Sequence, residues 1–304
     1  MLMEPMTVAH RWFGIRVGGR IEPGSPIWFF RRDRIGMACL AFVGLVALIA
    51  ILAPYLTPYA AEGRGVPNVV NKLHPPSREH PFGTDVLGRD SLARVFFGAR
   101  VALAVSVTVV SLSVLIGVVL GALAGFYGNW IDDVIMRITD IFMGFPPLLL
   151  AIAIAAALGP SLTNTIIAIA LVWWPWYARL VRGQAISVRE RNYVRAARSI
   201  GVPDLTIIRR HIVPNVLTPV FVQAAMDMGS AILVSAGLSF IGLGPQPPTP
   251  DWGLMVNEGR QYILAGRWWI ATFPGLAIFM TVLAFNLLGD SVRDASDPRV
   301  RGAG

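Results

Sequence analysis

Long apolar stretches with few charges are the feature that most constrains how this chain can fold. Crossing about 30 Å of hydrocarbon takes roughly 20 residues of helix, and six stretches approach that length. Lipid offers backbone groups no water to bond, and the stretches lack the alternation of barrel strands, so we expect helices. The predicted spans are Ile35–Leu56, Val101–Phe126, Ile138–Leu158, Leu162–Leu180, Val216–Leu243 and Trp268–Leu288. The sequence therefore predicts an all-α integral membrane protein with about six transmembrane helices.

The composition supports a membrane class. Of the 304 residues, 55% are hydrophobic and 14% are charged, whereas a soluble domain carries roughly 25% charged residues. The net charge of +8 would also suit a nucleic-acid partner, so the position of the arginines has to decide between the two. The single cysteine, Cys39, lies in an apolar run, which excludes an internal disulfide or a cluster of thiolate ligands.

The arginines predict the orientation of the chain. Arg31, Arg32 and Arg34 stand directly before the first span, and positive residues accumulate on cytoplasmic flanks. The amino terminus is therefore predicted to lie inside, and an even number of spans returns the carboxyl terminus to the same side. The segment between spans four and five also falls inside, and its many arginines agree with that placement.

This topology divides the chain into segments. Residues 1–34 are expected to form a cytoplasmic segment and 35–56 the first transmembrane helix. Residues 57–100 form an outward loop, 101–291 the core transmembrane domain, and 292–304 a cytoplasmic tail. The core domain includes the inward segment 187–215 and the proline-rich outward loop 244–267, whose prolines favour an extended shape.

The outward segments contain candidate functional residues. Asp85 and Arg89, and likewise Asp90 and Arg94, stand in an i,i+4 acid-before-base arrangement, and Thr84 is a candidate cap. One interpretation is local capping and pairing. The other is an outer gate or a contact with an external binding protein, made by Asp85, Arg89, Asp90 and Trp252.

Catalytic signatures are absent from the sequence. A P-loop needs a lysine after a glycine-rich turn, and the only lysine is Lys72, in NKLHPPS. The four histidines form no HExxH, and a metal centre from His74 and His80 is disfavoured. The serine of the GLSF stretch, residues 237–240, has no histidine base within any predicted span. We therefore expect no enzyme activity, and no cofactor or metal in this chain.

The inward segment Arg191–Asn215 reads as two short helices. The first has an apolar face at i, i+3, i+4 and i+7, made by Tyr193, Ala196, Ala197 and Ile200. Gly201 is expected to supply the left-handed turn that ends this helix. Pro203 suits the opening of the second helix, Asp204 its first turn, and Pro214 its end.

Three interpretations of this helix-turn-helix compete. A DNA-binding motif would use similar residues, but both ends of this segment are tethered to membrane spans. A solvated basic loop explains the arginines but not the regular apolar face. A docking surface for a soluble partner explains both, because small residues permit close approach and arginines face acidic groups.

The same segment resembles the cytoplasmic motif of ABC importer permeases. That motif has Glu-Ala-Ala, three residues, Gly, nine residues, and then Ile-x-Leu-Pro. This chain has RAARSIG, residues 195–201, and HIVP, residues 211–214, at the same spacing. It departs from the motif at Arg195, His211 and Val213, which weakens any salt bridge expected from the first position.

Two outward stretches resemble the dipeptide, oligopeptide and nickel branch of this family, as a C-type permease. They are HPFGTDVLGRDSLARVFFGAR, residues 80–100, and LSFIGLGPQPPTPDWGLMVNEGR, residues 238–260. The branch often has Glu where Ser235 stands here, so no acidic role is expected at that position.

The resemblance implies a permease that forms half of the pathway of an ATP-driven, binding-protein-dependent importer in a bacterial inner membrane. It implies a second homologous permease, two cytoplasmic ATPase subunits that bind ATP and Mg²⁺, an external substrate-binding protein, surrounding lipid, and no nucleic acid. Peptides are the leading cargo, with nickel or another small solute as alternatives. The residues expected to couple to the ATPases are Tyr193, Arg195, Ala196, Ala197, Ile200, Gly201, Asp204, His211 and Pro214.

Two acids inside predicted spans are functional candidates, because a charge in lipid is costly. Asp227 could line the translocation path and meet a cationic end of a peptide, or bond to a neighbouring helix. Asp140 lies one turn from Arg137, and a local pair is expected there. A rival function, a proton-coupled secondary transporter, would use Asp140 and Asp227 as relays.

Overall fold

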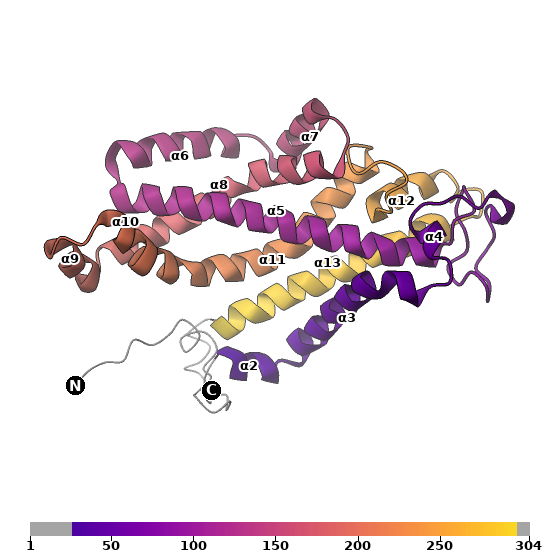
Figure 1. Cartoon of the computed structure of the whole chain (residues 1–304), viewed down its shortest axis with the longest axis horizontal. Helices are drawn as coiled ribbons and strands as arrows, with labels where there is room; N and C mark the ends of the chain where they lie inside the picture. Colours follow the sequence, from indigo (N-terminus) through magenta and orange to yellow (C-terminus); the bar gives the residue numbers. More distant parts are fainter. Residues whose placement is uncertain (1–25, 297–304) are drawn as a thin grey trace.

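The computed structural model describes residues 26–296, which form an elongated bundle of helices (Figure 1). The long helices are α3 (Arg34–Leu56), α5 (Ser91–Tyr127), α8 (Leu162–Arg189), α11 (Val213–Phe240) and α13 (Trp269–Ser296). The shorter elements are α2 (Pro26–Arg32), α4 (Ala60–Gly63), the 3₁₀ turn η1 (Val69–Asn71), α6 (Asn129–Met143), α7 (Pro147–Leu158), α9 (Asn192–Ser199), α10 (Asp204–Ile207), the π-helical turn η2 (Ile208–Ile212) and α12 (Trp252–Arg260). The predicted all-α class is confirmed for the described residues.

Within the described range, four helices are long and apolar enough to cross a membrane. They are α3, α5, α13 and the continuous stretch Asp204–Phe240, and the bent pair of α6 and α7 would make a fifth span. The predicted span 162–180 lies in α8, whose 28 residues reach about 42 Å at 1.5 Å per residue, but α8 also carries Arg179 and Arg182. The count of six spans and the orientation stay predictions.

The predicted third span, Ile138–Leu158, is not one continuous helix. α6 ends at Met143, α7 begins at Pro147, and the two helices meet at an angle of 90°. The break falls on Gly144, Phe145 and Pro146, directly before Pro147. Prolines lack the N–H that a continuing helix needs, and Pro147 instead suits the first turn of a new one.

Several helix ends also differ from the predicted segments. α5 begins at Ser91 rather than near Val101, because the Asp90 side chain caps it by accepting the Ala93 N–H at 2.7 Å. The predicted outward loop 57–100 therefore holds α4, η1 and the start of α5, and the loop 244–267 holds α12. α13 continues into the predicted tail. The rest of that tail beyond residue 296, and residues 1–25 of the predicted cytoplasmic segment, lie outside the described residues.

A glycine stripe brings α5 against α8. Gly117, Gly121 and Gly125 recur at every fourth position, and a Cβ on each would lie 2.3 to 2.7 Å from an α8 atom. Small residues at this spacing let helices approach closely in a membrane. In α11, Gly229 packs on α13 in a similar way, whereas a Cβ on Gly237 would meet no atom within 4 Å.

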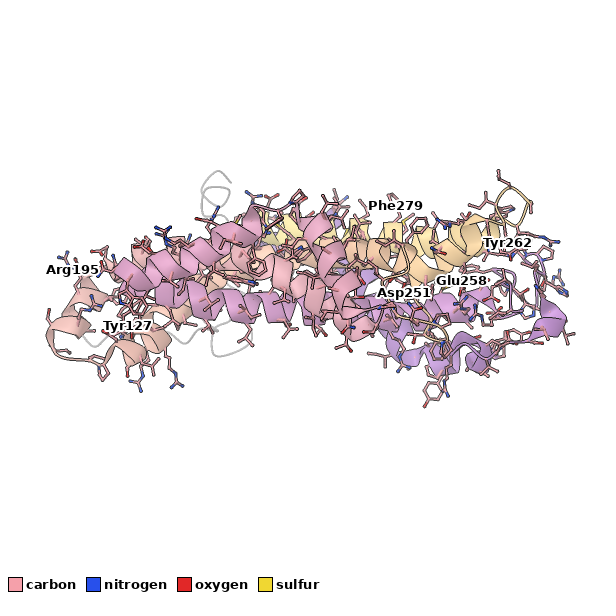
Figure 2. All side chains as sticks on the ribbon, turned by 90° about the horizontal axis from the view of Figure 1, so that it is seen from above. Tyr127, Arg195, Asp251, Glu258, Tyr262 and Phe279 are labelled. Carbon is pink, nitrogen blue, oxygen red and sulfur yellow. The ribbon has the colours of Figure 1, made fainter. Side chains whose placement is uncertain are left out.

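The inward and outward segments lie at opposite ends of the bundle. Figure 1 shows α9 and α10 at one end, and α4 and α12 at the other. Figure 2 places Arg195 at the first end and Asp251, Glu258 and Tyr262 toward the second. We call them the inner end and the outer end. Their separation agrees with the topology that the apolar stretches predict.

Candidate functional site

The helix-turn-helix of the inner end has the predicted left-handed turn. Gly201 has φ +79°, a conformation that glycine adopts without steric cost. The Val202 N–H bonds the Ala197 carbonyl and the Gly201 N–H bonds the Arg198 carbonyl, each at 3.1 Å. These two bonds form a Schellman motif, which satisfies the last carbonyls of α9. Gly201 is therefore needed for its backbone conformation.

The predicted end of the second helix at Pro214 is wrong. α10 runs through η2 directly into α11, and the Val213 N–H bonds the carbonyl of Ile208, five residues earlier. A proline ring clashes with the carbonyl four residues before it in a regular α-helix. The wider π-helical turn lies at this point and lets the chain continue. As a result, the inner end is an extension of α11 rather than a separate unit.

An apolar cluster fixes the inner end to the long helices. It joins Val194 of α9, Ile207 of α10 and Ile212 of η2, all at most 2% exposed, to buried side chains of α5, α8 and α11. The other buried members are Val118, Ala122, Phe126, Tyr177, Val181, Ala185, Val188, Ile208, Val216 and Val220. A force on α9 or α10 would therefore reach three long helices through a continuous packed core.

Polar contacts add to this attachment. Arg189 at the end of α8 donates to the carbonyls of Gly125 and Phe126 near the end of α5, at 3.2 Å each. The carboxyl end of a helix carries partial negative charge, so a cation is favourable there. The Arg198 guanidinium lies 4.8 Å from the centroid of the Phe126 ring, within cation–π range.

The predicted apolar face of α9 points away from the helix bundle. Tyr193 and Ile200 are 42% and 80% exposed, and Ala196 is exposed as well, whereas Ala197 packs against the core cluster. Leu205 of α10, at 61% exposure, is a further uncovered apolar residue of the inner end, and sequence reasoning missed it. The residue that α9 buries is Val194. The inner end therefore presents an apolar surface that the described chain leaves uncovered.

Charged and aromatic residues surround that surface. Arg195, Arg209 and Arg210 are exposed. Asp204, in the first turn of α10, pairs with Arg198 at 3.7 Å. The His211 ring lies 5.8 Å from that of Tyr193. The predicted coupling residues are thus gathered at one end, with Pro214 at the start of α11.

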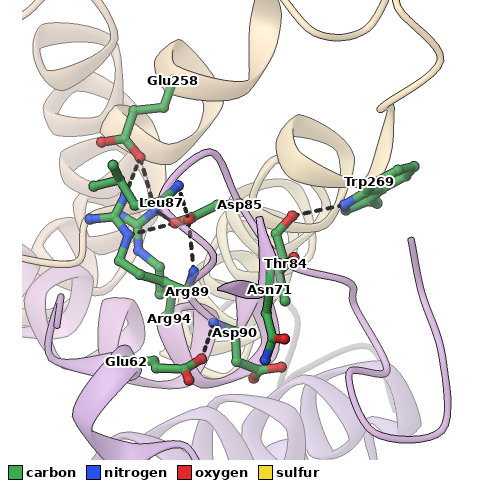
Figure 3. A network of polar contacts seen from close by, with 10 residues as sticks. All are labelled: Glu62, Asn71, Thr84, Asp85, Leu87, Arg89, Asp90, Arg94, Glu258 and Trp269. Atoms are coloured by element: carbon green, nitrogen blue, oxygen red, sulfur yellow. Dashed lines mark hydrogen bonds and ion pairs between the residues drawn. The ribbon is translucent and has the colours of Figure 1, made fainter. Parts of the chain in front are cut away.

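The outer end contains a buried network of four charges (Figure 3). The Asp85 carboxylate bonds Arg89 and Arg94 at 2.6 Å each, and Glu258 of α12 bonds the same arginines at 3.0 and 2.8 Å. Asp85 and both arginines are 1% exposed. Because each charge has opposite partners, the network compensates much of the cost of burial. It joins the start of α5 to α12.

The predicted Asp85–Arg89 pair is confirmed, but the predicted Asp90–Arg94 pair is wrong. Arg94 turns to Asp85 and Glu258, while the Asp90 side chain caps α5 and bonds His80 at 2.9 Å. Burial raises the pKa of Asp90, opposed by its bonds to the Ala93 N–H and His80. The spacing along the sequence suggested two acid–base pairs. The tertiary packing instead determines which acid each arginine bonds.

Trp252 completes the outer end as a buried packing residue. It is 3% exposed, and its indole N–H donates to the Val95 carbonyl at 2.9 Å. A Cβ on Gly98 would lie 2.6 Å from this ring, so the glycine makes room for it. Thr84, the candidate cap, is buried and accepts the His74 N–H at 2.8 Å. The four outer candidates thus hold this end together, and a gating role or binding-protein contact stays a prediction.

Asp227 lines a pocket of about 570 Å³ between α8 and α11. It accepts hydrogen bonds from the Tyr177 hydroxyl at 2.5 Å and the Gln223 amide at 2.9 Å. Asp227 therefore bonds a neighbouring helix, as one of its two alternatives expected, and a place on the translocation path stays a prediction. Asp140 pairs with Arg179 of α8 at 2.5 Å, so the expected local pair with Arg137 is wrong.

Comparison with known proteins identifies the family of this helical bundle. Residues 117–302 match the family of binding-protein-dependent transport system inner membrane components, and residues 27–76 match the N-terminal transmembrane domain of oligopeptide transport permease C. The chain belongs to this permease family. The match favours the ATP-driven interpretation over the proton-coupled alternative, and it places the protein in a membrane.

Three curated relatives cover most of this chain. The dipeptide transport system permease DppC of Alkalihalophilus pseudofirmus is 48% identical over 86% of each chain. The glutathione transport system permease GsiD of Escherichia coli is 46% identical, over 90% of this chain and 89% of its own. The probable D,D-dipeptide permease DdpC of Escherichia coli is 43% identical, over 93% and 94%. These similarities confirm the branch that the motifs indicated.

Solved structures support the fold. The MetNI methionine ABC transporter, in an inward-facing conformation, aligns with 67% of this chain and 96% of its own, with a TM-score of 0.51 and 20% identity. An amino acid ABC transporter aligns with 66% and 92%, with a TM-score of 0.50 and 18% identity. At this identity, the likeness concerns the arrangement of helices.

Proposed function

We propose that this permease imports peptides, and that its inner end couples transport to ATP hydrolysis in separate subunits. Three relatives named for dipeptides, glutathione and D,D-dipeptides support the peptide cargo. Nickel or another small solute is the alternative cargo. A second, homologous permease completes the pathway, and ATP with Mg²⁺ binds to the partner ATPases.

The observation that carries the coupling role is the contrast between the two faces of the inner end. The side that points away from the bundle leaves Tyr193, Ile200 and Leu205 exposed. The side that faces the bundle is continuous with the core of α5, α8 and α11. An exposed apolar surface indicates a partner. A partner that moves this surface would rock the helices packed behind it, which is how alternating access opens one side and then the other.

The external binding protein would meet the outer end. There the side chains of Ile263 and Leu264, between α12 and α13, are 46% and 100% exposed. The buried charge network at the same end holds α12 to α5. This arrangement supports a rigid outer rim on which a binding protein rests.

The test is transport by the purified system in sealed vesicles. We expect uptake of a radiolabelled dipeptide only when this chain, its paired permease, the ATPase subunits, the binding protein and ATP are all present. Uptake by the permeases without ATPase subunits, driven by a proton gradient, would contradict the proposal. If the system took up nickel but no peptide when ATP was supplied, the proposed cargo would be wrong and the proposed coupling role would remain.

A further inference from the structure

The pocket between α8 and α11 has a polar wall built on one helix face. Gln223, Asp227 and Ser230 of α11 recur at i, i+4 and i+7, and all three line the cavity. Residues at this spacing share a face. The stripe lies near the middle of α11. Sequence reasoning singled out Asp227 alone, although the spacing of its polar neighbours was readable.

The opposite wall is aromatic. Trp173, Trp176 and Tyr177 of α8 line the same cavity, and 54% of Trp176 is exposed. The faces of tryptophan rings attract ammonium and guanidinium groups. Tyr177 is 1% exposed and points its hydroxyl at Asp227, so it positions the carboxylate against the aromatic wall.

The uncompensated charge of the pocket is negative. Arg179 also lines it, but Asp140 pairs with Arg179 at 2.5 Å. Asp227 receives two neutral donors, and no basic side chain in residues 26–296 forms an ion pair with it. Each of its oxygens keeps further acceptor capacity. An ionised carboxylate at this depth is costly unless a cation joins it.

We propose that this pocket binds the ammonium group of the cargo, with Asp227 as the acceptor and the two tryptophans as a cation–π wall. This inference rests on the proposed function and adds a recognition site within the permease to it. A peptide's free amino terminus supplies such a group. The volume of about 570 Å³ lies within the range of roughly 300 to 1,000 Å³ of small-molecule sites.

The test compares Asp227→Asn with the wild type in the complete reconstituted transporter, with binding protein and ATP. We expect the substitution to lower dipeptide uptake at least about tenfold, equal to roughly 1.4 kcal/mol, because Asn keeps the size but not the charge. Asp227→Glu keeps the charge and is expected to recover part of the uptake. Asp133→Asn is the matched control, since Asp133 is an exposed acid of α6 outside this pocket.

The outcomes separate this inference from the proposed function. If the wild type shows no ATP-driven uptake, the proposed function fails. If the wild type is active and Asp227→Asn stays within twofold of it, the ammonium site is overturned and the proposed function stands.

A second measurement avoids the risk that the variant does not assemble. In the wild-type transporter without binding protein, a dipeptide amide should change tryptophan fluorescence saturably, whereas its N-acetylated form should not. Equal responses to the two compounds would overturn the proposal.

Discussion

The two ends of this permease differ in how their charged side chains are buried and paired. At the outer end, Asp85, Arg89 and Arg94 are each 1% exposed, and both arginines bond Asp85 and Glu258. At the inner end, most arginines stay exposed, and the pair between Arg198 and Asp204 has side chains 52% and 42% exposed. The outer end therefore satisfies the charges of this network within the chain. The inner end leaves both charged and apolar groups open.

This difference shows which end satisfies its buried charges without a partner molecule. Removing one partner from a buried ion-pair network leaves an uncompensated charge, so such a network is expensive to break. An exposed pair contributes little to folding, and its groups remain free to meet another molecule. We infer that the outer end is built as a fixed rim and the inner end as a surface for a partner.

The largest expected effect is the loss of Asp85. Asp85→Ala should destabilise the permease by about 3 to 5 kcal/mol, because Arg89 and Arg94 would stay buried with Glu258 as their remaining acid. Thermal unfolding of the purified protein in detergent would measure this. Asp204→Ala at the inner end is the matched control and should change stability by less than about 0.5 kcal/mol. Similar losses in the two variants would remove the contrast between the ends.

The second effect concerns the turn at Gly201. Gly201→Val should cost roughly 1 to 2 kcal/mol locally, since a β-branched residue does not tolerate φ near +79°. We expect the chain to insert normally but to lose ATPase subunits on co-purification. Gly201→Asn separates conformation from contact, because Asn tolerates the left-handed region. If the Val variant couples transport normally, the turn has no coupling role.

The third effect concerns the exposed apolar face of the inner end. Ile200→Asp should leave thermal stability within about 0.5 kcal/mol, because the side chain is 80% exposed. It should nevertheless weaken ATPase binding in a pull-down assay, since the new charge would be buried against the partner. Leu264→Asp, on a fully exposed residue of the outer end, should bind the ATPases as the wild type does. Retained binding in both variants would move the docking surface elsewhere.

The smallest effect concerns the caps and their pH dependence. Burial raises the pKa of Asp251, which caps α12 by accepting the Leu254 N–H at 2.9 Å. A raised folded pKa means that the stability from this group is present in acid and is lost as the pH rises through that pKa. Asp251→Asn keeps the cap and should unfold at a slightly higher temperature than the wild type at neutral pH, with little difference in acid.

Asp33, the cap of α3, supplies a control of opposite sign. A hydrogen bond from Ser291 lowers the pKa of Asp33, so its stability is present at neutral pH and lost as the pH falls through the lowered pKa. Asp33→Asn should therefore unfold at a lower temperature than the wild type at neutral pH. Thermal scans of both Asn variants across the acid range would check the two signs. Shifts in the same direction would contradict the assignment.

The sequence by itself determined the features that depend on neighbouring residues. Apolar length predicted helices, Gly201 predicted a left-handed turn, and the motif spacing placed the inner end between two long helices. Each of these follows from backbone sterics or from transfer into lipid, which act over a few residues. The break directly before Pro147 belongs here too, because its signal was present and was overlooked.

Only the tertiary structure decided which distant groups meet. Arg94 bonds Glu258 rather than Asp90, Asp140 bonds Arg179, and Tyr177 bonds Asp227. Spacing along a helix shows which residues share a face, but not which face of another helix it meets. That choice depends on how side-chain volumes fit, as where Gly117 admits α8 and Gly98 admits Trp252. The close packing of helices that are far apart in the chain therefore determines the ion-pair and hydrogen-bond partners that the local sequence pattern does not.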